Sequence, residues 1–180
     1  AIAVRLDPHG PYQPDEHWLQ AALRREPSLV GVESPALREV PAWRPAGERR
    51  TFSRGYLDLM GLDGQGDVRI VEAKIAKSTD EMTLFQGVDY MVWAAAYKDA
   101  IKAKLSAPAQ ATFHLHFVVG AMDGTKGLLP ARIPQYADAL DTDDRAIRYH
   151  FHVVSGWQSW RPDARPKLMS TPHPKNTLPS

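Results

Sequence analysis

The sequence predicts an α/β fold in which a mixed β-sheet is flanked by helices. Three observations predict this class. Apolar residues recur at helical spacing in residues 15–25, near the start of the chain. Short apolar or alternating segments bounded by turn residues follow between residues 36 and 75, as is typical of strands. A long helical segment at residues 80–105 then precedes a further strand, so helices and strands alternate along the chain.

The first helix is predicted to begin after Asp15 and to continue to about Arg25. Asp15 is a favourable N-cap because its carboxylate can accept a hydrogen bond from the first turn. Leu19 and Leu23 lie one turn apart and mark the apolar face. Pro27 follows and ends the helical pattern.

Three strands are predicted next. Residues 36–43 (ALREVPAW) predict a strand interrupted by Pro41. A polar, arginine-rich segment separates this strand from residues 56–62 (YLDLMGL). Residues 68–75 (VRIVEAKI) predict the next strand, and the intervening DGQG is a strong turn signal. The last two strands are therefore expected to form a hairpin.

The second half of the chain continues the alternation. Residues 80–105 predict one long helix, rich in good helix formers, which Pro108 ends. Residues 112–121 (TFHLHFVVGA) predict a strand, and a short helix is expected after Pro134 (QYADAL). Residues 146–155 (AIRYHFHVVS) predict a final strand.

The 180 residues suit a single domain. We expect a loose segment at residues 1–13, one domain at residues 14–160, and a flexible tail at residues 161–180, where the sequence is polar and proline-rich. The chain has no cysteine, which excludes disulfides, thiolate zinc sites and cysteine nucleophiles. The absence of cysteine fits a cytoplasmic protein, and no apolar segment is long enough to span a membrane. The net charge of +1 is lower than that of many nucleic-acid-binding proteins.

Charged residues in the predicted hairpin form the main candidate site. Asp58 lies between two leucines, and Glu72 and Lys74 lie two residues apart, so their side chains share one face of a strand. Charges in central strands are costly unless they are paired or bound to a metal ion. Mg²⁺ prefers carboxylate and carbonyl oxygens, which Asp58, Glu72 and the backbone of Ala73 could supply. Lys74 could then orient a water molecule or neutralise developing charge.

These segments resemble a known superfamily. GYLDL followed by IVEAK resembles the Asp…Glu-x-Lys core of the PD-(D/E)XK nucleases. Glu16, in EHWLQAALRREPSLVG, is similar to the glutamate of the first helix in the RecB-like and archaeal-type mismatch endonuclease branch. Gln86 and Tyr90, in QGVDY, resemble its Gln-x-x-x-Tyr motif. The resemblance covers about residues 15–121, and Leu57 stands where many members have proline.

The resemblance implies a restriction-endonuclease-like fold with an α-β-β-β-α-β core. It implies a divalent-metal-dependent nuclease, in particular an endonuclease, that uses Mg²⁺ or Mn²⁺ and acts on DNA in preference to RNA. It leaves room for a homodimer or a partner domain. The resemblance also implies a role for each residue. Asp58, Glu72 and the Ala73 carbonyl would bind the metal ion with assistance from Glu16, and Lys74 would position the attacking water. Gln86 and Tyr90 would orient these groups or contact substrate.

Several side chains are candidates for holding nucleic acid. A cluster of arginines precedes the strand of Asp58, and basic side chains there could bind phosphates. Tryptophans could stack on bases, although core packing is the favoured interpretation for them. The phosphate-contact candidates are Arg49, Arg50, Arg54 and Lys77, with Arg44 beside them, and the tryptophans are Trp43, Trp157 and Trp160.

Other interpretations of the same residues remain open. The charged hairpin could be a solvated face with a cross-strand ion pair, Glu26 or Glu33 could replace Glu16, and Tyr90 could belong to the core. The chain could be a non-catalytic nucleic-acid-binding or assembly domain of the same fold. The chief rival for the chemistry is a set of imidazoles on two strands that could converge on a transition metal. These are His114, His116, His150 and His152.

Overall fold

A six-stranded mixed sheet forms the centre of the protein, for which a computed structural model describes residues 14–33, 35–43, 54–75, 81–121, 147–158 and 165–170. The strands lie in the order of the sequence. The first three pair antiparallel, β3 pairs with β4 and β4 with β5 in parallel, and β5 pairs with β6 antiparallel. The strands are β1 (Leu37–Trp43), β2 (Arg54–Leu62), β3 (Val68–Ile75), β4 (Phe113–Gly120), β5 (Ile147–Ser155) and β6 (Lys167–Ser170).

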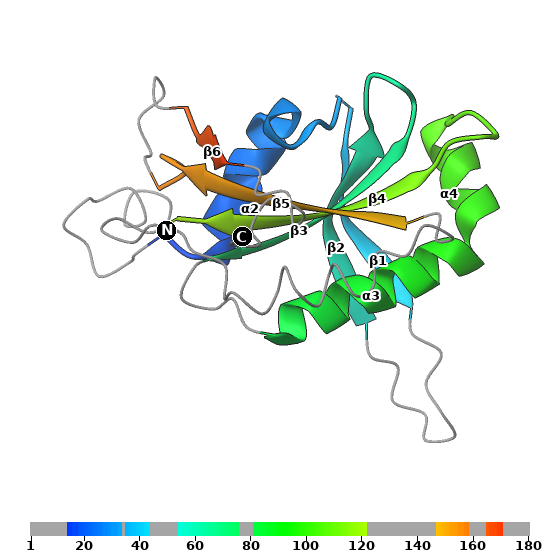
Figure 1. The fold of residues 1–180 in the computed structure, drawn as a ribbon, viewed down its shortest axis with the longest axis horizontal. Helices are drawn as coiled ribbons and strands as arrows, with labels where there is room; N and C mark the ends of the chain where they lie inside the picture. Colours follow the sequence, from blue (N-terminus) through cyan, green and yellow to red (C-terminus); the bar gives the residue numbers. More distant parts are fainter. Residues whose placement is uncertain are drawn as a thin grey trace, which may run out of the picture.

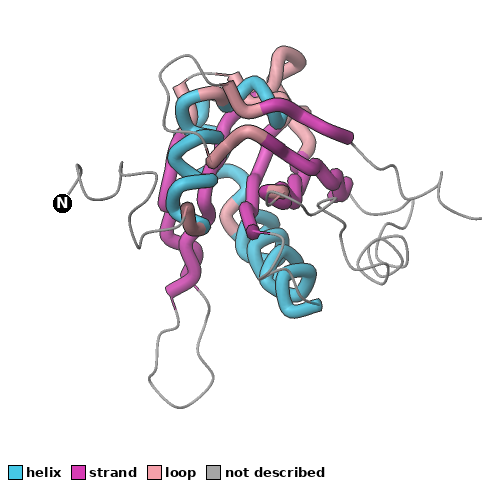
Figure 2. Tube along the Cα trace, turned by 90° about the vertical axis from the view of Figure 1, so that its left-hand side faces the viewer, coloured by secondary structure: helices cyan, strands magenta, loops and turns pink. Residues whose placement is uncertain are grey.

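Helices cover both faces of this sheet (Figure 1). Helix α2 (Glu16–Arg25) lies on one face and leads into the short 3₁₀ helix η1 (Pro27–Val30). Helix α3 (Glu81–Ala96) lies on the other face and is followed by α4 (Lys98–Leu105). The same separation of α2 from α3 is visible after a quarter turn (Figure 2). The predicted α/β class, with a mixed sheet between helices and the core order α-β-β-β-α-β, is confirmed.

Two apolar clusters, one on each face, hold the layers together. Leu19 and Leu23 of α2 are buried in one cluster with Val71 of β3. Tyr90 of α3 is buried in the other, with Phe117 of β4. Successive strand residues point to opposite faces, so each central strand contributes to both clusters. Burial on two faces explains why β4 reads as a continuous apolar segment interrupted only by histidines.

The predicted start of the first helix and the predicted hairpin are confirmed. The Asp15 side chain accepts a hydrogen bond from the backbone of Trp18, at 3.1 Å, and so caps α2. In the DGQG turn, the Asp63 carboxylate accepts hydrogen bonds from the backbone N–H groups of Gln65 and Asp67, at 2.8 and 2.9 Å. This side chain therefore fixes the turn between β2 and β3.

Three expectations about secondary structure need correction. The helix expected over residues 80–105 breaks at Tyr97, whose φ of −112° is not helical, and the resulting bend leaves Ile101 of α4 in the α3-side core. Pro41 does not interrupt β1 and lies opposite Tyr56 of β2, because β1 is at the edge of the sheet, where proline is tolerated. Within the expected flexible tail, residues 167–170 form β6, because the edge of β5 offers unpaired backbone groups.

The helix expected after Pro134 lies outside the described residues. Among the described segments, no helix is long and apolar enough to cross a membrane.

Candidate active site

The candidate site lies where β2 and β3 separate. Their regular pairing reaches Leu59 opposite Val71. Beyond this point, the backbone N–H of Ala73 donates to Asp58 Oδ2, at 2.7 Å. At the point where β2 and β3 separate, this backbone N–H of β3 is therefore bound by a side chain of β2. The hydrogen bond holds the Asp58 carboxylate beside the gap between the two strands.

The Asp58 carboxylate is also held from α2. Gln20 donates from Nε2 to Asp58 Oδ1, at 2.7 Å. Gln20 in turn bonds His17 on the exposed side of the helix, at 3.2 Å. Both oxygens of Asp58 thus have fixed partners, one from the sheet and one from the helix that covers it. Two fixed donors limit the rotation of the carboxylate.

Glu72 and Lys74 meet on β3 as their spacing predicts. Lys74 Nζ lies 2.9 Å from Glu72 Oε1 and 3.1 Å from Glu16 Oε1. Glu72 is only 1% exposed, so the interpretation of this face as solvated is wrong. Its second oxygen, Oε2, is buried and has no hydrogen-bond partner among the described residues. Buried polar atoms without partners are rare and call for a specific explanation.

Burial and repulsion from neighbouring carboxylates raise the pKa values of both carboxyl groups strongly. Burial raises the pKa of Asp58 to about 6, against the lowering effects of the Ala73 N–H and the Lys74 charge. Burial and the nearby Asp58 charge raise the pKa of Glu72 to about 8. At neutral pH the two groups therefore retain about one proton between them. A bound cation could replace that proton, because it would compensate both charges.

Lys74 is a permanent cation in this site. Burial lowers its pKa, but the charges of Glu72 and Glu16, with their hydrogen bonds, outweigh that effect and raise the pKa above its ordinary value. Lys74 therefore has protons to donate and no lone pair to offer at neutral pH.

Gln86 and Tyr90 lie beside this cluster on α3. Gln86 Nε2 donates to the Tyr90 hydroxyl at 2.6 Å, and that hydroxyl donates to the backbone carbonyl of Tyr56 at 3.0 Å. Tyr90 is 1% exposed and belongs to the core, as one interpretation of the sequence held. Its hydroxyl ties α3 to β2 two residues before Asp58. A Cβ at Gly55 would approach the Tyr90 ring within 2.9 Å, so the two elements pack closely.

The acids considered in place of Glu16 lie elsewhere. Glu26 forms an ion pair with Arg165. Glu33 is exposed, and its carboxylate lies near Gly64 in the turn between β2 and β3. Glu16 is the one of the three that bonds Lys74.

The sequence interpretation missed Gln20. Gln20 follows Glu16 by four residues and so shares its helix face, which was the available signal. A glutamine on an amphipathic helix is a common surface residue, and only the packing of α2 over β2 and β3 gives it a partner.

The candidates for nucleic-acid contact mostly fall outside the described residues. Arg44, Arg49, Arg50 and Lys77 lie there, as does Trp160. Arg54 opens β2 and Trp43 closes β1, but the side chains of both are outside the described part. Trp157 is described and is a core residue: it is 1% exposed, and its Nε1 donates to the Ala121 carbonyl at 2.8 Å.

Comparisons with known proteins do not assign the chain to a family. No family model matches it, and no curated protein matches its sequence. Among solved structures, it is similar to a repair endonuclease from Pyrococcus abyssi, with 16% identity and a TM-score of 0.36. The match covers 77% of this chain and 46% of that one, so this chain spans less than half the length of that protein. A likeness this distant assigns no activity.

Proposed function

We propose that this protein is a metal-dependent nuclease that hydrolyses phosphodiester bonds, with DNA favoured over RNA as substrate. One observation carries the proposal: Asp58 and Glu72 bring two carboxylates together at the end of β3 beside Lys74, and the buried Glu72 Oε2 has no partner in the described part of the chain. Buried acids gathered in this way are typical of functional sites and costly elsewhere.

The residues fit a hard divalent cation such as Mg²⁺ or Mn²⁺. Such ions take carboxylate and carbonyl oxygens. Asp58 and Glu72 would hold the ion, with the Ala73 carbonyl as a further oxygen and Glu16 assisting through its water shell. A bound divalent cation lowers the pKa of water and stabilises charge on a phosphate.

The side chains of the site have separate tasks in this proposal. Lys74 stays protonated, so it cannot accept a proton from water at neutral pH. It donates hydrogen bonds instead, which orient the attacking water or stabilise negative charge that develops on the phosphate. Gln20 holds Asp58 in place. Gln86 and Tyr90 position β2 through the Tyr56 carbonyl, and the burial of Tyr90 argues against a direct contact with substrate.

A cleavage assay tests this proposal. Single-stranded, duplex and branched DNA, and RNA, are incubated with the protein in Mg²⁺, Mn²⁺ or EDTA. We expect metal-dependent cleavage that falls about 100-fold or more in Lys74→Ala, because lost stabilisation of transition-state charge typically costs that much. Asp58→Asn should have a similar effect. Lys98→Ala, at the exposed first position of α4, is the matched control and should cleave like wild type.

The alternative is a non-catalytic nucleic-acid-binding or assembly domain with the same fold. Wild-type protein that binds nucleic acid but cuts none of these substrates would favour that alternative. Cleavage that persists unchanged in Lys74→Ala and Asp58→Asn would contradict the assignment of the site. Folding of each variant is checked by circular dichroism, so that loss of structure is not mistaken for loss of chemistry.

A further inference from the structure

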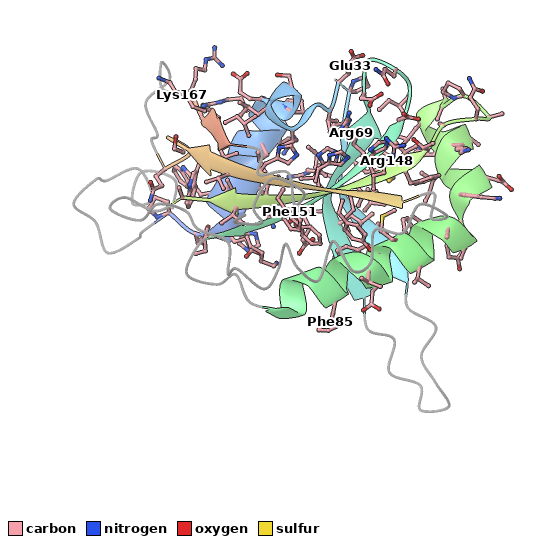
Figure 3. The ribbon with its side chains drawn as sticks, in the orientation of Figure 1. Glu33, Arg69, Phe85, Arg148, Phe151 and Lys167 are labelled. Carbon is pink, nitrogen blue, oxygen red and sulfur yellow. The ribbon has the colours of Figure 1, made fainter. Side chains whose placement is uncertain are left out.

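Four histidines line one face of the two parallel strands β4 and β5. His116 of β4 pairs in register with His150 of β5. His114 lies two residues before His116 on β4, and His152 lies two residues after His150 on β5, so both share that face. The intervening residues Leu115, Phe117 and Phe151 belong to the core on the α3 side, so the imidazoles project from the opposite face. In Figure 3, Arg69 and Arg148 appear on that face and Phe151 on the other.

The imidazoles are close enough to share one ion. His114 Nδ1 lies 2.9 Å from His150 Nε2, and His116 Nδ1 lies 2.6 Å from His152 Nε2. One ring nitrogen from each of His114, His116 and His150 lies within 4.8 Å of the other two. The rings of His116 and His150 are stacked, with centroids 4.5 Å apart.

The environment keeps these rings neutral. Burial lowers the pKa of every member, and the neighbouring histidines and Arg69 lower the pKa of His116 further. Neutral imidazoles each have one nitrogen lone pair, which a metal ion requires. His152 is 7% exposed, and its Nδ1 is buried without a partner in the described segments. The cluster therefore does not satisfy all of its own hydrogen-bonding groups.

Two polar side chains lie beside the second ring nitrogen of His114. Its Nε2 lies 2.9 Å from Thr112 Oγ1 and 3.6 Å from Asp67 Oδ2. The Thr112 hydroxyl also hydrogen-bonds the Asp67 carboxylate, which can only accept, so the hydroxyl donates to Asp67 and accepts from His114 Nε2. The lone pair of His114 is then on Nδ1, which faces His150. Histidine ligands of metal ions are commonly oriented by such a hydrogen bond from their other ring nitrogen.

Arg69 already binds one ring nitrogen of this cluster. Its guanidinium donates to His116 Nε2 at 2.7 Å, which places the His116 proton on Nδ1. Ligation through His116 Nδ1 requires that proton to move to Nε2, and Arg69 must then release the ring. Arg69 would keep its ion pair with Asp63, at 2.7 Å, so its charge stays compensated.

We infer that His114, His116 and His150 form a binding site for a transition-metal ion that prefers imidazole nitrogen, such as Zn²⁺, with His152 as the candidate for a fourth ligand. Three histidines are a common ligand set for Zn²⁺. The site would cross-link β4 to β5. It is on the opposite face of the sheet from Glu72 and uses nitrogen in place of oxygen ligands, so it does not depend on the proposed nuclease activity.

Cobalt titration of the metal-stripped full chain tests this inference. Co²⁺ in a tetrahedral nitrogen site gives visible absorption bands far stronger than those of Co²⁺ held octahedrally by oxygen ligands. We expect one equivalent of Co²⁺ to give saturable bands that Zn²⁺ abolishes. His150→Ala should weaken binding about 100-fold or more, since even the loss of a supporting partner costs about 10- to 100-fold. Asp58→Asn, which alters the carboxylate site, should leave the bands unchanged.

Three outcomes would overturn the inference: wild-type protein without saturable bands, bands equal in wild type and His150→Ala, or bands lost in Asp58→Asn and kept in His150→Ala. If His150→Ala does not fold, imidazole ¹⁵N NMR of wild-type protein during Zn²⁺ titration replaces it. Shifts of ring nitrogens in His114, His116 and His150 with one equivalent of Zn²⁺ would support the site. Unchanged ring nitrogens would contradict it.

Discussion

Asp58 illustrates how much of the candidate site depends on single hydrogen bonds. Burial of its carboxylate raises its pKa to about 6. The same carboxylate accepts hydrogen bonds from Ala73 and Gln20, which favour its charged form. Each donor fixes one oxygen. The orientation of the carboxylate toward Glu72 is therefore set by residues that need not touch a substrate.

Gln20→Ala tests this positioning role. Loss of the donor should destabilise the charged form of Asp58 and raise its pKa, because a hydrogen bond to a carboxylate favours ionisation. The acid side of the pH–rate profile for metal-dependent cleavage should then move to higher pH, and the apparent affinity for Mg²⁺ should fall about 10-fold. A cleavage assay across pH and Mg²⁺ concentration measures both.

Ala21→Ser is the matched control for Gln20→Ala, since Ala21 is exposed on the same helix. It should leave the profile unchanged. A lower rate in Gln20→Ala with neither a shifted pH profile nor weaker Mg²⁺ dependence would argue for a merely structural role.

Helix α3 shows how one element is placed by close packing. Gly87 faces the sheet, and an added Cβ would lie 2.7 Å from Leu115 Cδ2 and still closer to the Phe117 ring. Glycine is a poor helix former, so its presence in the interior of α3 reflects this close approach. Because Gln86 and Tyr90 flank Gly87, the same contact brings Tyr90 within reach of β2.

Gly87→Ala is therefore expected to destabilise the protein despite its higher helix propensity. Overpacking typically costs about 1–3 kcal/mol, which should exceed the gain of about 1 kcal/mol from replacing glycine in a helix. Urea unfolding followed by circular dichroism measures the change. Val92→Ala, at a position 66% exposed on the same helix, should change the free energy of unfolding by less than about 0.5 kcal/mol. Stabilisation by Gly87→Ala would show that α3 can move away from the sheet.

At the scale of the whole molecule, the described residues contain two buried titratable clusters that act in opposite directions on stability. Glu72 has a folded pKa near 8, raised from an ordinary 4.5, so the stability that its proton contributes is lost progressively as pH rises from about 4.5 through 8. His150 and His152 have folded pKa values near 4, lowered from 6.5. The unfolded chain therefore binds more protons at these histidines below about pH 6.5, and stability falls as pH decreases.

The metal-free protein should thus be most stable near pH 6 to 7. Thermal unfolding in EDTA across pH 4.5 to 9 measures this. Glu72→Gln should flatten the alkaline side and raise stability at pH 8.5 by about 1–2 kcal/mol, because it removes a buried charge. Below about pH 6 its stability should fall more steeply than that of wild type as pH decreases, because the proton that folded Glu72 keeps above pH 4.5 no longer offsets the effect of the histidines. A stability maximum above pH 8 in wild type would contradict the buried state of Glu72.

The sequence by itself determined the fold class and indicated most of the residues that the fold brings together in the candidate site. Two-residue alternation in VRIVEAKI put Glu72 and Lys74 on one face, and helical spacing put Gln86 one turn from Tyr90. The Asp15 cap and the DGQG turn were also predictable, because both depend on neighbours within a few residues. Periodicity and local hydrogen bonding are properties of the chain that survive in the fold.

Tertiary structure alone decided the features that depend on contacts distant in sequence. Gln20 and Asp58 are 38 residues apart, and no local pattern predicts that α2 would lie across the gap between β2 and β3. The pairing of residues 167–170 with β5 likewise depends on the open edge of a strand formed earlier in the chain. The convergence of the histidines required β4 and β5 to be parallel neighbours in one register. Such contacts arise from packing layers together, and sequence spacing does not record them.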